Sequence, residues 1–143
     1  MSMDSLIKKA IDKQPTIKPR TKRNAQPEAI EQAKVIAWAK RHEHIYPYLW
    51  LLHCSLNGVK MTKAQAVRAI AQGMKKGVSD LFLPVKKGVF SGLYIEMKSE
   101  KGRTSIDQSK FLTAVSENDY SAHICYSAVE AIDKIKDYYN LSN

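Results

Sequence analysis

The chain has 143 residues, 44% of them hydrophobic, and this length fits one domain that can bury a core of its own. No apolar stretch approaches the ~20 residues of a membrane helix. The N-terminus MSMDSLIKKAIDK lacks the apolar centre of a signal peptide, so we expect an intracellular protein with no membrane span.

Basic residues are in clear excess. The chain carries 23 Lys and Arg against 14 Asp and Glu, a formal net charge of +9, which makes a polyanionic partner plausible. Residues 1–26 hold seven basic and two acidic side chains, and residues 60–110 hold eleven and four. Composition alone is equally compatible with solvated surface lysines and with nucleic-acid binding.

Residues 1–26 are predicted to form a flexible basic arm. The stretch KQPTIKPRTKRNAQP has three prolines, many charges and one isoleucine, too little apolar surface to order itself. A short helix over residues 5–11 is the one element we expect there. Residues 27–143 then form the folded domain.

The first part of that domain predicts two helices and a strand. Good helix formers after a proline predict a helix over 27–42, and an aromatic and aliphatic run predicts a strand over 48–54. A threonine cap and a following glycine delimit a helix over 63–72. We expect Trp38 and Trp50 to lie in the core.

A hairpin comes next. Residues 80–85 and 89–98 flank a turn and predict two antiparallel strands. Alternation along the second strand puts one set of side chains on one face and another set on the opposite face: Leu93, Ile95 and Met97 on the first, Tyr94, Glu96 and Lys98 on the second.

The remaining residues predict a helix capped by Ser105 and running to about residue 116, a strand over 121–126 and a helix over 128–139. The order is therefore helix, strand, helix, strand, strand, helix, strand, helix. It predicts an α/β domain with a mixed sheet flanked by helices.

One group of residues suggests chemistry. Asp80 opens the first strand of the hairpin and Glu96 lies near the end of the second, so the two carboxylates can meet. Glu96 and Lys98 point the same way. Carboxylates are ligands for Mg²⁺ or Mn²⁺, and a metal beside a lysine suits phosphodiester hydrolysis. A surface hairpin with an ordinary Lys–Glu pair would show the same residues.

These residues stand in a longer motif. The stretch GMKKGVSDLFL, followed by GLYIEMKSEKGRTSIDQSKF, resembles the G…GxPDL…GLxIExK…G…SxxQ pattern of the virus-type replication-repair nuclease (VRR-NUC) domain, a branch of the PD-(D/E)XK nuclease superfamily. The likeness spans about residues 28–138. Ser79 stands where the family has proline.

The resemblance implies a restriction-endonuclease-like core and a metal-dependent DNA endonuclease that uses Mg²⁺ or Mn²⁺. It further implies structure-selective cleavage of branched DNA, such as Holliday junctions or forks, in viral or phage replication or repair. Stand-alone phage-type members look like homodimers, and a phage-encoded protein would act in the host cytoplasm. The alternative is a noncatalytic DNA-binding or packaging protein on the same fold.

Two further residues are implied by the family pattern, each with a competing role. A first-helix glutamate of the metal site matches Glu31, with Glu28 as the alternative; either could instead complement the helix dipole. The family's active-site glutamine matches Gln108. Ser105-x-x-Gln108 is also a capping box, and we expect the capping role and the active-site role to exclude each other.

Basic residues flank the motif and suggest a track for DNA phosphates, with salt-sensitive binding independent of sequence. They are Lys75, Lys76, Lys86, Lys87, Lys101 and Arg103.

Overall fold

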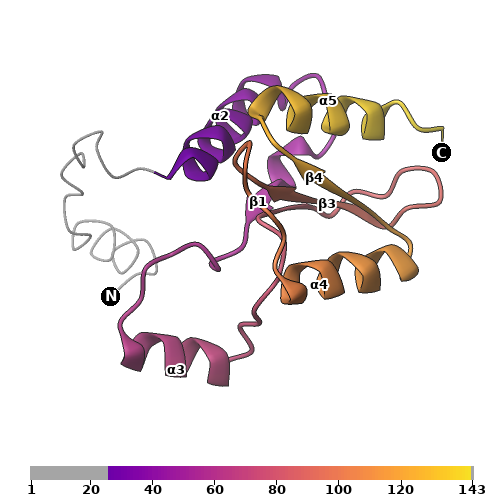
Figure 1. Ribbon diagram of the computed structural model, residues 1–143. Coiled ribbons are helices and arrows are strands. Elements are labelled where there is room, and N and C mark those ends of the chain that lie inside the picture. Colours follow the sequence, from indigo (N-terminus) through magenta and orange to yellow (C-terminus); the bar gives the residue numbers. More distant parts are fainter. Residues whose placement is uncertain (1–25, 143) are drawn as a thin grey trace, which may run out of the picture.

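The computed structural model describes residues 26–142, so the expected arm and its short helix lie outside the described residues. Figure 1 shows the arrangement of the elements. In chain order they are α2 (Pro27–His42), the 3-10 helix η1 (Leu49–Leu51), β1 (His53–Cys54), α3 (Lys63–Ala71), β2 (Leu81–Leu83), β3 (Gly92–Met97), α4 (Ile106–Glu117), β4 (Tyr120–Cys125) and α5 (Ala128–Tyr139).

The sheet is mixed, with strand order β1-β2-β3-β4. β1 and β2 pair antiparallel, and so do β2 and β3, with Leu81 opposite Ile95. β4 runs parallel to β3, and the chain makes this parallel crossover through α4. The predicted α/β fold with a mixed sheet and flanking helices is confirmed. The predicted hairpin is also present, with strands shorter than expected.

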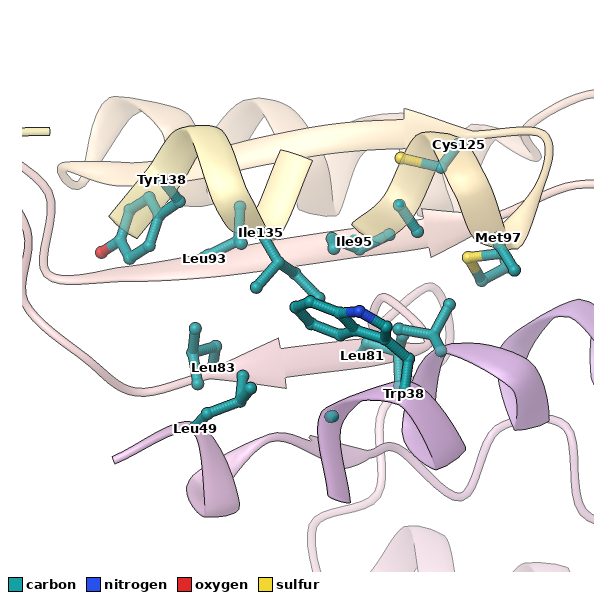
Figure 2. Packing of buried hydrophobic residues seen from close by; sticks show 14 residues of the cluster. Trp38, Leu49, Leu81, Leu83, Leu93, Ile95, Met97, Cys125, Ile135 and Tyr138 are labelled. Atoms are coloured by element: carbon teal, nitrogen blue, oxygen red, sulfur yellow. The ribbon is translucent and has the colours of Figure 1, made fainter. Parts of the chain in front are cut away.

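Helices cover both faces of the sheet. In Figure 1, α2 and α5 lie over one face and α4 over the other. The core fills the space beneath α2 and α5, where Ile95 and Met97 of β3 face Trp38 and Ile135 (Figure 2). Within residues 26–142, no helix combines the length and the hydrophobicity needed to cross a bilayer.

The opposite face of β3 is aromatic near its start and polar near its end. Tyr94 stacks on Phe82 with ring centroids 4.3 Å apart and meets the edge of Phe111 of α4 at 5.2 Å. Glu96 and Lys98 follow on the same face and form an ion pair. The alternation predicted for this strand is therefore confirmed.

The strand expected over 48–54 is wrong for most of its length. Tyr48 has a left-handed backbone (φ 63°), a 3-10 turn follows, and only His53–Cys54 is a strand. The turn buries Leu49 completely and leaves Trp50 64% exposed, so the expectation that Trp50 lies in the core is also wrong. A short aromatic run does not distinguish a strand from a turn whose shape is set by tertiary packing.

The loop between α3 and β2 closes onto the start of α4. Gly77 has a positive φ of 82°, and a Cβ built on it would lie 2.5 Å from the backbone carbonyl of Asp107. Only glycine permits this approach. It fixes the residues that lead into Asp80 against the helix that carries Gln108.

Candidate active site

Asp80 and Glu96 meet at one end of the β2–β3 pair. Asp80 directly precedes β2, and its Oδ2 accepts a 2.7 Å hydrogen bond from the backbone N–H of Met97. That bond ties the Asp80 carboxylate to the residue between Glu96 and Lys98. Antiparallel pairing therefore brings together two carboxylates that are sixteen positions apart in the sequence.

The two oxygens of Glu96 differ in their surroundings. Oε1 accepts a 2.6 Å hydrogen bond from Nε2 of Gln108 and lies 3.2 Å from Nζ of Lys98. Oε2 is buried and has no hydrogen-bond partner among residues 26–142. Glu96 is only 1% exposed, and an unsatisfied buried carboxylate oxygen is costly. Asp80, the other acid in contact with Glu96, can supply a donor to it only when one of the two carboxyl groups is protonated.

Burial and crowding shift both carboxyl groups. Burial, reinforced by the charge of Asp80, raises the pKa of Glu96 to about 7, against the lowering effect of Lys98. The pKa of Asp80 is also raised, chiefly by burial, although the Met97 N–H and Lys98 oppose the shift. Two acids held this close out of water favour a shared proton or a bound cation.

Gln108 contacts both the cap of α4 and the carboxylate of Glu96. Its amide oxygen accepts from the N–H of Ser105 at 2.8 Å, which completes the capping box of α4, while its amide nitrogen donates to Glu96. A backbone N–H can only donate, so it turns the amide oxygen toward the cap and leaves the NH₂ group for the carboxylate. Contrary to the expectation, the cap leaves Gln108 able to contact Glu96 at the same time.

The two glutamates of α2 have different neighbours. Oε1 of Glu28 accepts from the N–H of Ser99 at 3.1 Å, and its charge raises the pKa of Asp80. Glu31 instead accepts from the N–H of Ala128 at 2.7 Å and pairs with Lys34. Glu31 thus completes the N-terminus of α5, and it is Glu28 that the structure brings toward Asp80.

The basic residues of the expected DNA track divide into two groups. Lys75 and Lys76 precede Asp80 in the α3–β2 loop, and Lys101 and Arg103 follow Lys98 in the β3–α4 loop. All four of these flanking side chains are exposed.

The other two basic residues, Lys86 and Lys87, lie in the β2–β3 connection. This connection is at the opposite end of the same strands, so the track is not one continuous set.

Two features of the site were not apparent from the sequence. Ser79 is buried, and no group in the described part of the chain hydrogen-bonds to its hydroxyl. A groove of about 450 Å³, which we call the α2 groove, also opens beside Asp80. The sequence does not reveal this groove, because it forms between segments that are far apart in the chain. It is lined by Ala33, Ala37 and Lys40 of α2 and by Cys54, Val59 and Asp80.

The residues present can accommodate a divalent cation. In the described part of the chain, no group of three or more His, Cys, Asp and Glu side chains is arranged as a complete metal site. Mg²⁺ is commonly held by one or two carboxylates while it keeps several waters. Asp80 and the unsatisfied Oε2 of Glu96 match that smaller requirement.

Comparisons with known proteins agree with this geometry. The family model of the VRR-NUC domain matches residues 14–129. A solved structure described as a "VRR_NUC domain protein" superposes with a TM-score of 0.70, covering 84% of this chain and 93% of that chain, at 23% identity. At that identity the likeness shows the fold alone. A search of curated protein sequences gave no match. Because the family model covers most of its length, the chain belongs to the VRR-NUC domain family and has a nuclease-type fold.

Proposed function

We propose that this protein is a metal-dependent DNA endonuclease that hydrolyses phosphodiester bonds with Mg²⁺ or Mn²⁺. The observation that carries the proposal is Oε2 of Glu96, a buried carboxylate oxygen without a partner, next to the second carboxylate of Asp80. A protein that only binds DNA gains nothing from buried acids facing phosphate. The noncatalytic alternative is disfavoured for this reason.

Asp80 and Glu96 would hold the metal ion. When bound, the ion would polarise the phosphate and lower the pKa of a coordinated water. Gln108 holds Oε1 of Glu96 by a hydrogen bond, which would leave Oε2 available to the ion. Glu28, which is bonded to Ser99, supplies negative charge beside Asp80.

Lys98 would act on the phosphate. Its ammonium lies beside Oε1 of Glu96, with its side chain only 9% exposed. An ammonium held in this position can orient the attacking water or offset the negative charge that develops on the phosphorane. Lys98 therefore has a catalytic role in this proposal, separate from metal binding.

The four flanking basic residues would bind the DNA backbone. Lys75, Lys76, Lys101 and Arg103 precede or follow the site in two loops, so they can contact phosphates on both sides of the scissile bond. Such contacts are independent of sequence and sensitive to salt. Lys86 and Lys87 lie too far along the strands to share this role.

We further propose branched DNA, such as a Holliday junction or fork, as the substrate in viral or phage replication or repair, with a second copy of the chain as partner. The support for a second copy comes from α3, which has no buried residue. Its apolar side chains Val67 and Ile70 are 68% and 53% exposed and could be buried against a partner. Two copies related by a two-fold axis would match the symmetry of a four-way junction. Sedimentation at several protein concentrations tests this part.

A cleavage panel tests the activity itself. Labelled duplex, flap, fork and four-way junction of the same sequence would be incubated with protein in Mg²⁺, Mn²⁺ or EDTA. We expect cleavage with either metal, none in EDTA, and more product from the branched substrates. Binding of all four DNAs without cleavage in either metal would favour the noncatalytic alternative.

A further inference from the structure

Two aromatic side chains stand on the surface where α2 leads into β1. Tyr48 and Trp50 are each 64% exposed. Trp50 is one of two tryptophans in the chain, and the other, Trp38, is buried in the core. A large aromatic ring in water forgoes the free energy that burial would provide. Two such rings with only one residue between them call for a functional explanation.

The backbone of this segment is held firmly. The hydroxyl of Tyr139 donates a 2.8 Å hydrogen bond to the carbonyl of Pro47, and Leu49 is completely buried. Tyr48, between these two anchors, has a left-handed backbone with φ 63°. This conformation is uncommon for a bulky residue and costs free energy. The backbone that carries the two exposed rings is therefore anchored on both sides of Tyr48.

Positive charge lies close by in the chain. The last turn of α2 carries Lys40 and Arg41, and Lys40 also lines the α2 groove, which has Asp80 among its other lining residues. The groove follows α2 from Ala29 to Lys40, a rise of about 16 Å. That length corresponds to about five nucleotide steps at the spacing of a B-form strand. A DNA strand leaving Asp80 along this groove would reach the basic end of α2.

We propose that Tyr48 and Trp50 form a stacking site for unpaired DNA bases, which an unpaired strand reaches along the α2 groove. The proposal rests on the DNA-binding part of the proposed function, because it takes DNA at Asp80 as its starting point. Aromatic side chains beside positive charge bind single strands by stacking, in a manner that tolerates any base. Paired bases are already stacked within the duplex, so the site would favour substrates with an unpaired strand.

The test uses Trp50 as its own reporter. Metal-free protein would be titrated with an oligothymidylate of about eight nucleotides, a length within the usual site sizes, while tryptophan emission and iodide quenching are measured. Iodide reaches Trp50 and not the buried Trp38. We expect emission to fall and Trp50 to become protected from iodide as the strand binds. A blunt duplex of equal length should give less of both.

Variants separate stacking from general binding. Trp50→Ala should weaken oligothymidylate binding roughly 5- to 100-fold, the effect of losing one stacked base, and Trp50→Phe should retain most of the affinity. Val89→Ala, which shortens a side chain that is 79% exposed in the β2–β3 connection, is the matched control and should bind as the parent protein does.

Three results would overturn the proposal. They are unchanged Trp50 emission and iodide access at saturating oligothymidylate, parental affinity in Trp50→Ala, and iodide protection that grows with protein concentration without DNA. The last would assign the patch to a second copy of the chain. Because the titration needs no metal, it is independent of the cleavage panel. Stacking at Trp50 together with no cleavage in Mg²⁺ or Mn²⁺ would refute the proposed catalysis and leave the stacking site standing.

Discussion

The two ends of the β2–β3 pair are built on the same strands, but they differ in how well their buried polar groups are hydrogen-bonded. At the connecting end, the hydroxyl of Tyr138 donates to the carbonyl of Val85, and Lys87 lies 5.8 Å from the ring centroid of Tyr139. At the open end, Asp80 and Glu96 are buried together and one carboxylate oxygen has no partner. The first end closes the fold. At the second end, the buried carboxylates lower the stability of the fold, which is typical of a functional site.

Removing either carboxylate should give the largest effect. Asp80→Ala or Glu96→Ala is expected to abolish cleavage in Mg²⁺ and Mn²⁺, because the proposed metal site loses one of its two carboxylates. DNA binding should persist or tighten, since a negative charge facing phosphate is lost. Gel-based cleavage and fluorescence anisotropy measure the two properties separately. Unchanged cleavage by either folded variant would refute the site assignment.

Variants of Lys98 test whether the open end contributes to catalysis in addition to the proposed metal binding. Lys98→Ala should lose roughly 10²-fold or more in rate, as for other single electrostatic groups at reacting centres. Lys98→Arg should recover only part, because the broad guanidinium fits a compact ammonium site poorly. Mn²⁺ affinity by calorimetry should stay nearly constant in both. Near-normal turnover would reduce Lys98 to an ion-pair partner of Glu96.

Glu28 and Glu31 form a matched pair one helical turn apart. Glu28→Gln should lower the cleavage rate roughly 10- to 100-fold, as the loss of groups that support a metal site often does. Glu31→Gln should keep the rate and lower Tm, because it weakens the contact with the N-terminus of α5. Single-turnover cleavage and thermal unfolding distinguish the two. The reverse pattern would make Glu31 the functional acid.

The pH dependence of stability should reveal the buried acid. The pKa of Glu96 is about 7 in the folded protein, against 4.5 for an exposed glutamate. Between these values the unfolded chain releases a proton that the folded protein keeps. The free energy of unfolding of the metal-free protein should therefore fall as pH rises across this window, by on the order of 1–3 kcal/mol.

Glu96→Gln should flatten that fall, because a glutamine does not titrate. Glu100→Gln, at an exposed acid nearby, is the control and should keep it. Chemical denaturation of the metal-free proteins at pH 5, 6, 7 and 8 measures the difference. An equal slope in parent and Glu96→Gln would show that the buried carboxyl group is not the source.

The smallest effect should come from exposed charge. The double variant Lys101→Ala/Arg103→Ala and the double variant Lys86→Ala/Lys87→Ala each remove two positive charges, one pair at each end of the strands. The first should weaken DNA binding and lower the log–log salt slope by about 2. The Lys86→Ala/Lys87→Ala variant should have a smaller effect on both DNA affinity and the salt slope. Equal slopes would mean that DNA contacts both ends.

Local patterns in the sequence determined much of this protein. Alternation placed Glu96 and Lys98 on one face of a strand, because side chains alternate whatever packs on them. Both capping boxes, at Thr62 and Ser105, follow from residues three apart. The approach of Asp80 to Glu96 was likewise predictable, because the two residues lie on the strands of one hairpin and a hairpin is a local structure.

The position of each candidate site residue relative to the others was decided only by the tertiary structure. Glu28 and Glu31 are one turn apart, and the docking of α2 against β3 and α5 selects which of them lies beside Asp80. The same docking buries Trp38, while a left-handed residue at Tyr48 turns Trp50 outward. Gln108 could join cap and carboxylate only after α4 was placed over β3. Each outcome depends on a contact between segments far apart in the chain, which short-range periodicity does not specify.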